Sequence, residues 1–271
     1  MTRQLRKAIS CVRVVRIIVA AVLLHAVASH SQAQQPGGLF DSGSLQFRYP
    51  ANWGVPTVVT VKSCPLLSPT DIPDGVAPEH IAVVFSGTRP IPKDYLAPCS
   101  FPVFDLPEVR IFPVAAYADL YPDGARALSA LRRLLNNGSH APGSEVPYVP
   151  FVDASPAFTE HFAFIPFRNG SGAVFLTQWM TEPDAIGEHL VYIFQGLSAD
   201  GKTYVLATFP TTYSGTLPAF TVPQGERIEQ TQTRYKPYAK GVAHTLGKAK
   251  ESDFSPSLSD VQALLSSIRL K

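Results

Sequence analysis

The alternation of apolar and polar positions is clearest in the second half of the chain, where it predicts four successive β-strands. Val, Ile, Phe, Tyr and Thr dominate these segments, and such side chains suit a pleated, packed surface. Asn-Gly in the segment 169–172 and Asp-Gly in the segment 198–202 favour tight turns. We therefore predict an antiparallel meander with strands at residues 162–168, 173–180, 190–197 and 203–210.

Shorter strand patterns occur earlier in the chain. Residues 45–49 alternate between apolar and polar side chains, and the β-branched segment 57–62 is predicted to be their neighbour. Residues 34–44 contain Gly and Ser, so we expect a loose segment there. Further strands are predicted at residues 80–86 and 107–113, and irregular, Pro-rich loops at 63–78, 87–106 and 139–156.

Helical spacing of apolar residues appears in the remaining segments. In the segment 123–136, leucines fall on one face and arginines on the other. The segment 226–248 has an inward stripe that Pro237 interrupts, while Ser257 and Asp260 open the last helix with the spacing of a capping box. The predicted helices are residues 114–121, 123–136, 226–248 and 258–268.

These elements predict one α+β domain at residues 34–271, including its long Pro-rich loops. A largely antiparallel sheet carries the meander, and helices pack on it. No internal repeat and no change of composition indicates a second domain.

The first 33 residues have the pattern of a signal peptide. Five basic residues precede an apolar run at 17–28, and small residues follow it. Cleavage after Ala33 would give a mature chain that begins at Gln34, and cleavage after Ala28 is the alternative. An uncleaved N-terminal membrane anchor is the other interpretation, although the apolar run is only about half the ~20 residues that span a bilayer. No membrane span is expected after cleavage.

Removal of this leader changes the net charge. The whole chain has 23 Lys and Arg residues and 21 Asp and Glu residues. The leader holds five of the basic residues and none of the acidic ones, which leaves 18 against 21 and a net charge of −3. Proteins that bind nucleic acid usually carry a basic excess, so we expect no nucleic-acid partner.

Cys64 and Cys99 are predicted to form a disulfide. Cys11 leaves with the leader, and an even pair of cysteines outside the cytoplasm favours a disulfide over a metal site. Two thiols without nearby histidines make a poor zinc site, so no metal is expected. Two buried free thiols are the alternative.

No motif identifies a catalytic site. The sequence lacks the nucleophile pattern Gly-x-Ser-x-Gly, a Gly-rich phosphate loop and a dinucleotide fingerprint, and no cofactor is expected. Glu160-His161 and Glu188-His189 are acid–histidine neighbours at the starts of strands in the meander. They could meet across strands and form a hydrolase site, or they could be solvated strand ends.

Aromatic side chains are the other candidates for a binding site. Long loops border one rim of the predicted sheet, and concave sites of this kind bind small molecules. The same side chains would otherwise build the core under the helices. The four candidates are Trp53, Phe175, Trp179 and Tyr192.

Two family resemblances extend this interpretation. The chain resembles uncharacterised exported bacterial proteins in the pattern Gly170-Ser171-Gly172, Phe175-Leu176-Thr177-Gln178, Phe194-Gln195-Gly196-Leu197 and Asp200-Gly201-Lys202-x-Tyr204-Val205. It is similar to the PsbP/Mog1 type of α/β/α sandwich in Phe47-Arg48-Tyr49-Pro50-x-x-Trp53 and in the closing Leu265-Ser266-Ser267-Ile268-Arg269-Leu270. The first resemblance implies export and a shared fold. The second implies a three-layer fold and an accessory binding role, and neither assigns functional residues.

The sequence therefore favours an exported, non-enzymatic binding or accessory protein, secreted or periplasmic, whose partner is an unidentified protein or small molecule. Two alternatives stay open. One is an exported hydrolase built from the acid–histidine pairs, and the other is an envelope structural protein without a small ligand.

N-terminal sequencing of the exported protein tests the leader. We expect the sequence to begin near Gln34, because the basic segment, the short apolar run and the small residues together form a cleavable signal. Membrane-bound material that still begins at Met1 would instead show an uncleaved anchor.

Overall fold

The computed structural model describes residues 37–66, 68, 75–87, 90–97, 99, 104–141 and 144–271. Pro36–Lys271 form one compact unit. In its described part, helices combine with mostly antiparallel sheets, which confirms the predicted α+β class. The leader and its two predicted cleavage positions lie outside the described residues.

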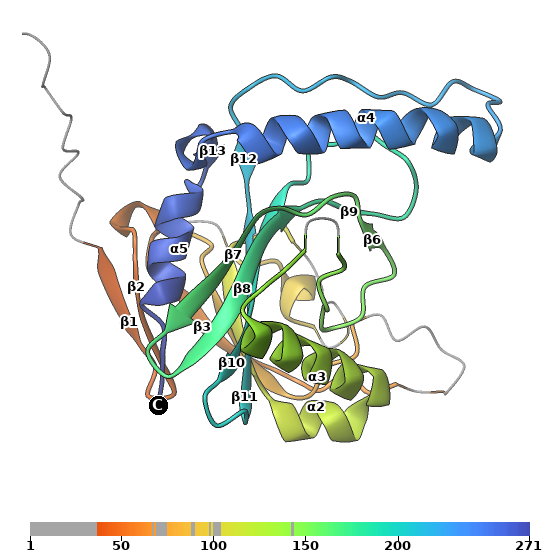
Figure 1. Ribbon diagram of the computed structural model, residues 1–271. Helices are drawn as coiled ribbons and strands as arrows, with labels where there is room; N and C mark the ends of the chain where they lie inside the picture. Colours follow the sequence, from red (N-terminus) through yellow and green to blue (C-terminus); the bar gives the residue numbers. More distant parts are fainter. Residues whose placement is uncertain are drawn as a thin grey trace, which may run out of the picture. The chain divides into compact units, whose positions relative to one another are not determined.

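A seven-stranded antiparallel sheet forms the centre of the fold (Figure 1). In spatial order it contains β3 (Thr57–Val61), β4 (His80–Val84), β5 (Glu108–Pro113), β11 (Thr203–Pro210), β10 (Val191–Ser198), β8 (Gly170–Thr177) and β7 (Glu160–Phe167). The last four of these strands are the predicted meander, since β7, β8, β10 and β11 each pair with the next. The meander is therefore confirmed.

The first hairpin of the meander has a shorter turn than the sequence predicted. Its turn consists of Arg168 and Asn169, and β8 already begins at Gly170. Gly172 lies within β8, where an added Cβ would lie 2.3 Å from the ring of Phe194. This glycine therefore belongs to the strand, where it leaves room for an aromatic ring.

A second sheet joins the two ends of the described chain. β2 (Leu45–Tyr49) lies between β1 (Gly38–Asp41) and β14 (Arg269–Leu270), and both pairings are antiparallel. Asn169 supports this arrangement from the meander. Its side-chain amide donates a hydrogen bond to the Leu270 carbonyl at 2.8 Å and accepts one from the Leu270 N–H at 3.0 Å.

Two predictions for this region are wrong. Residues 34–44 do not form a loose segment throughout, because β1 lies within them and Phe40 stacks on Phe47 with ring centroids 4.8 Å apart. The segment 57–62 does not pair with β2, since β3 pairs with β4 in the central sheet. Gly54 adopts a φ of 78° between the two strands, and this left-handed conformation helps to turn the chain from one sheet into the other.

Helices cover both faces of the central sheet (Figure 1). α4 (Ile228–Lys248) and α5 (Leu258–Ser266) pack on one face together with the small sheet. α2 (Val114–Leu120) and α3 (Pro122–Asn137) pack on the other. All residues of β10 are buried, so this central strand contributes to both cores. The layers follow the order α/β/α.

The predicted helices are confirmed, and α4 continues through Pro237. The start of α5 differs from the prediction. Ser257 precedes α5, but its hydroxyl lies 2.7 Å from Ser259 Oγ and forms no capping hydrogen bond. The capping box predicted for Ser257 and Asp260 is therefore wrong. The remaining short elements are η1 (Ala51–Trp53), η2 (Lys93–Leu96), η3 (Glu251–Asp253) and the strand pairs β6 (Ser155–Pro156) with β9 (Trp179–Met180) and β12 (Thr212–Tyr213) with β13 (Phe254–Ser255).

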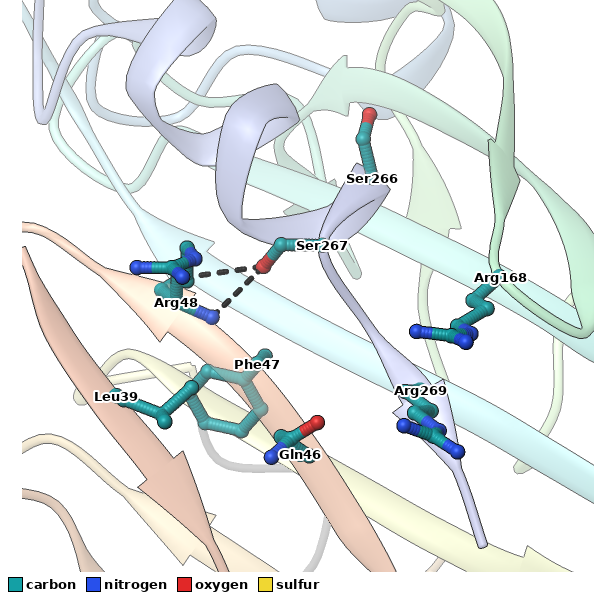
Figure 2. Close-up of a pocket in the computed structure, with 8 residues that line it drawn as sticks. All are labelled: Leu39, Gln46, Phe47, Arg48, Arg168, Ser266, Ser267 and Arg269. Carbon is teal, nitrogen blue, oxygen red and sulfur yellow. Dashed lines mark hydrogen bonds between the residues drawn. The ribbon is translucent and has the colours of Figure 1, made fainter.

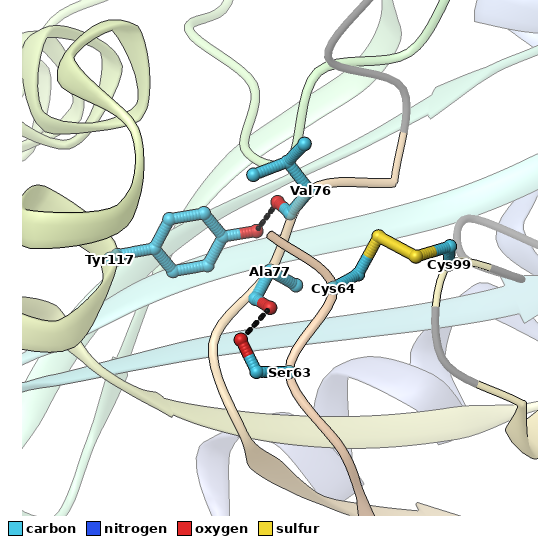
Figure 3. The surroundings of a disulfide bond; sticks show 6 residues. All are labelled: Ser63, Cys64, Val76, Ala77, Cys99 and Tyr117. Carbon is cyan, nitrogen blue, oxygen red and sulfur yellow. Dashed lines mark hydrogen bonds between the residues drawn. A yellow bond between two sulfur atoms is a disulfide. The ribbon is translucent and has the colours of Figure 1, made fainter. Parts of the chain in front are cut away.

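The predicted disulfide is confirmed. Cys64 and Cys99 are bonded, with Cα atoms 5.0 Å apart (Figure 3). Cys64 also exchanges two backbone hydrogen bonds with Ala77, at 2.8 and 3.1 Å. The hydroxyl of Tyr117 in α2 donates to the Val76 carbonyl at 3.1 Å. The disulfide, the bridge and the tyrosine thus hold irregular segments against α2.

Removal of this disulfide should destabilise the protein. Replacement of both cysteines by serine releases a closed loop with a sequence separation of 35 residues, for which the chain-entropy model gives a loss of roughly 2–4 kcal/mol. Urea unfolding of the oxidised wild type, the reduced wild type and the double variant measures this loss. Reduced wild type should resemble the variant. Equal stability of all three would contradict the prediction.

Candidate functional site

The two acid–histidine pairs lie in different environments. Glu160 is partly buried beside Gly247 of α4, and burial raises the pKa of its carboxyl. His161 Nε2 donates to the Leu246 carbonyl at 2.9 Å. Glu188 and His189 are exposed in the loop before β10. Within the described ranges, no hydrogen bond or ion pair joins the two pairs, so the hydrolase hypothesis receives no support from a shared contact.

The four aromatic candidates are divided between the two faces of the sheet. Trp53 packs on the face covered by α4 and α5, with ring centroids 5.4 Å from Phe85 and 5.5 Å from Phe209. Tyr192 is fully buried on the same face.

The other two candidates lie across the sheet. Phe175 is buried, and Trp179 is partly buried, in the core under α2 and α3. Trp179 contacts Tyr148, with ring centroids 4.8 Å apart. The four aromatic side chains therefore do not line one common groove.

A charged cluster is buried in the sheet near η2. Arg110 Nε donates to Glu108 Oε1 at 2.8 Å, and both side chains are 1% exposed. Tyr95 donates its hydroxyl to Glu108 Oε2 at 3.1 Å. Burial raises the pKa of Glu108, whereas these two donors favour its ionised form. Such a pair is costly to bury and costly to break, so the cluster constrains how the loops pack over the sheet.

His80 completes this cluster in its neutral form. Arg110 Nη1 lies 2.9 Å from His80 Nε2, and an arginine can only donate, so Nε2 accepts. The proton therefore resides on Nδ1, which donates to the Pro78 carbonyl at 2.8 Å. Burial is the main cause that lowers the pKa of His80 to about 4.

A pocket of about 380 Å³ lies where the small sheet, α5 and the first hairpin of the meander meet (Figure 2). We call it the arginine pocket. Its lining residues are Leu39, Gln46, Phe47, Arg48, Arg168, Ser266, Ser267 and Arg269. Three arginines from three separate segments therefore line one pocket.

Strand pairing and the hairpin turn position these arginines. Arg48 lies on β2 opposite Leu39 of β1, and Arg269 lies on β14 opposite Gln46 of β2. Arg168 occupies the hairpin turn, where its N–H donates to the Ile268 carbonyl at 3.1 Å. Figure 2 shows Arg168 and Arg269 on one side of the pocket and Arg48 on the other.

The nearby carboxylate of Asp41 already has its own partners. Lys271 Nζ lies 2.6 and 2.7 Å from its two oxygens, and Gln46 Nε2 donates to it at 3.0 Å. The hydrogen bond from Lys271 is the main cause that lowers the pKa of Asp41. By contrast, the guanidinium groups of Arg48, Arg168 and Arg269 form no hydrogen bond or ion pair with other residues in the described part of the chain.

The arginines are not needed as caps for the end of α5. Ser267 N–H reaches the Ala263 and Leu264 carbonyls at 3.2 and 3.0 Å, and Ile268 N–H donates to the Leu265 carbonyl at 3.1 Å. The Ala263, Leu264 and Leu265 carbonyls thus have backbone donors. Arginine stays protonated in proteins and presents a fork of N–H donors, so this pocket is suited to holding an anion and not to proton transfer.

Sequence reasoning missed all three arginines. Arg48 and Arg269 alternate with buried residues in short strands, a pattern typical of solvent-facing positions. Their convergence depends on the pairing of Leu45 with Leu270, and no local pattern indicates that pairing. The one available signal is Arg168 beside the predicted hairpin turn.

Two further searches cover the described residues only. Within these ranges, no group of three or more His, Cys, Asp or Glu residues could hold a metal ion. No helix in the described part of the chain has both the length and the apolar character to cross a membrane.

The low pKa of His80 predicts acid sensitivity. Between about pH 6.5 and 4, His80 is neutral in the folded protein but protonated in the unfolded chain. The contribution of neutral His80 to the free energy of unfolding is therefore complete above about pH 6.5 and is lost as the pH falls towards 4. The full loss corresponds to roughly 3 kcal/mol. His80→Gln should be less stable than wild type at pH 7 but should lose less between pH 7 and 4.5 in urea unfolding. The exposed His189→Gln is the control and should follow wild type, and an unchanged pH dependence in His80→Gln would contradict the assignment.

Comparison with known proteins gives no family for this chain: no family model and no curated protein matches it.

Proposed function

We propose that this chain is an exported, non-enzymatic binding or accessory protein that acts outside the cytoplasm and holds an anionic ligand in the arginine pocket. The observation that carries the proposal is the convergence of Arg48, Arg168 and Arg269 on one pocket, without a described protein partner for any of their guanidinium groups. An anion in the pocket would be attracted by three positively charged side chains.

The residue type supports recognition of an oxyanion. A planar guanidinium matches the oxygens of a carboxylate or phosphate with two parallel hydrogen bonds, which a lysine cannot do. The pocket volume of about 380 Å³ falls in the range of small-molecule sites. Arg48 and Arg168 are exposed, so we expect moderate affinity that weakens with added salt.

The disulfide and the N-terminal sequence support export. Disulfides persist in oxidising compartments and are rare in the cytosol, and Cys64 and Cys99 are bonded. The leader at residues 1–33 has the basic, apolar and small-residue order of a signal peptide. Both features favour a secreted or periplasmic location.

The two alternative functions make different predictions for this pocket. A hydrolase would need the acid–histidine pairs to act on a bound substrate, and they share no described contact. An envelope structural protein would not require an anion. Binding of an anion that depends on the three arginines would therefore favour the proposed function over both.

Thermal unfolding with and without anions tests the proposal. Millimolar phosphate, sulfate or citrate should raise the unfolding temperature of wild type above its value in chloride at the same ionic strength. The reason is that a ligand that binds only the folded state stabilises it, by about 2.7 kcal/mol at a hundred times its Kd. Arg168→Gln combined with Arg269→Gln should lose this shift.

The matched control is Arg133→Gln on the exposed surface of α3, which should keep the wild-type shift. The same shift in the double variant would mean that anions act on the solvent or elsewhere on the surface. No shift for any anion would remove the basis for the proposed function.

A further inference from the structure

We propose that the anion held in the arginine pocket is a phosphate monoester that carries an apolar group. This inference rests on the proposed function and specifies the class of ligand. Three observations lead to it: the arrangement of the three guanidinium groups, the charge balance of the pocket and the exposed apolar side chain that lines it.

The arrangement favours an anion with more than two oxygens. Arg168 and Arg269 lie on one side of the pocket and Arg48 on the other (Figure 2). A monocarboxylate offers two oxygens in one plane, which one guanidinium fork can occupy fully. A phosphate monoester offers three terminal oxygens in a tetrahedral arrangement, so arginines on opposite sides can each find an acceptor.

The charge balance favours a dianion. The three guanidinium groups lining the pocket carry three positive charges. Asp41, the carboxylate next to the pocket, is bonded to Lys271 at 2.6 and 2.7 Å and to Gln46 at 3.0 Å. These contacts keep Asp41 occupied. A phosphate monoester carries a charge of about −1.5 to −2 near neutral pH and is therefore attracted to three positive charges more strongly than a monocarboxylate is.

One exposed apolar side chain, Leu39, lies among the polar residues that line the pocket. Leu39 is 56% exposed, although its neighbour on β1, Phe40, is buried. It lies opposite Arg48 in the pairing of β1 with β2, so an apolar surface directly adjoins a guanidinium group. The volume of about 380 Å³ also exceeds what a phosphate group alone would fill, since one water takes about 30 Å³ in the liquid. An apolar substituent can therefore lie on Leu39 while the phosphate contacts the arginines.

Two sources supply this chemistry: a soluble alkyl or aryl phosphate, and the phosphate head group of a lipid such as phosphatidic acid. Either would present a phosphate monoester beside an apolar body. Separate arms of the experiment distinguish the two.

Calorimetric titrations at constant ionic strength, with phenyl phosphate, inorganic phosphate, sulfate and acetate as probes, test the inference. Phenyl phosphate should bind most tightly. Acetate should bind at least about tenfold more weakly, because it has one charge and two oxygens. Arg168→Gln and Arg269→Gln should each weaken phenyl phosphate binding, Arg168→Lys should restore it only in part, and Arg133→Gln should have no effect. Leu39→Ser should weaken phenyl phosphate but not inorganic phosphate.

The pH dependence gives a second readout. The second pKa of a phosphate monoester is about 6, so phenyl phosphate binding should fall about tenfold between about pH 7.5 and 5, whereas sulfate keeps its two charges and its binding should stay constant. The hydrogen bond from Lys271 lowers the pKa of Asp41, the carboxyl group next to the pocket. Constant sulfate binding also shows that the pocket remains folded at the lower pH.

Vesicle sedimentation separates the two sources. The lipid source is supported by sedimentation of wild type with vesicles that contain phosphatidic acid but not with vesicles of pure phosphatidylcholine. The double variant Arg168→Gln with Arg269→Gln should then fail to sediment with the vesicles that contain phosphatidic acid. Phenyl phosphate binding without vesicle retention supports a soluble ester. Acetate binding as tight as phenyl phosphate, or phosphate binding that ignores pH, would overturn the phosphate inference and leave the proposed function standing. Failure of every anion to bind would overturn both.

Discussion

The requirement to bury both faces of the central sheet determines the rest of this structure. β10 is buried along its whole length, so neither face can be left to water. Each Å² of apolar surface removed from water is worth about 25 cal/mol, and a central strand with two apolar faces gains only if covering layers exist on both sides. α4, α5 and the small sheet cover one face, and α2, α3 and the disulfide-linked segments cover the other.

The two covering layers differ in how they are held. The layer with α5 is fixed by packing and by the backbone pairing of β14 with β2. Irregular segments contribute to the opposite layer, and specific polar contacts hold them: the Cys64–Cys99 bond, the Tyr117 hydrogen bond to Val76, and the buried cluster around Arg110. The arginine pocket belongs to the first layer, so a compact, regularly paired scaffold supports it.

Local patterns in the sequence were sufficient for most of the fold. The meander, the four helices and the disulfide follow from alternation, helical spacing and an even cysteine pair, which are properties of neighbouring residues or of composition. The small sheet was not predictable in this way, because Leu45 pairs with Leu270 from the far end of the chain. The same long-range pairing creates the pocket, which explains why Arg48, Arg168 and Arg269 were missed while the acid–histidine neighbours Glu160-His161 drew attention.

The pairing of β2 with β14 also has a consequence for the order in which the molecule is completed. The meander consists of contacts between neighbouring segments, which form quickly during folding, whereas contacts between distant segments form slowly. β1 and β2 come early in the described chain, and their partner β14 comes only after the central sheet and the helices. The concave surface with three arginines therefore exists only once Arg269 has paired with β2, so the pocket is completed late in folding.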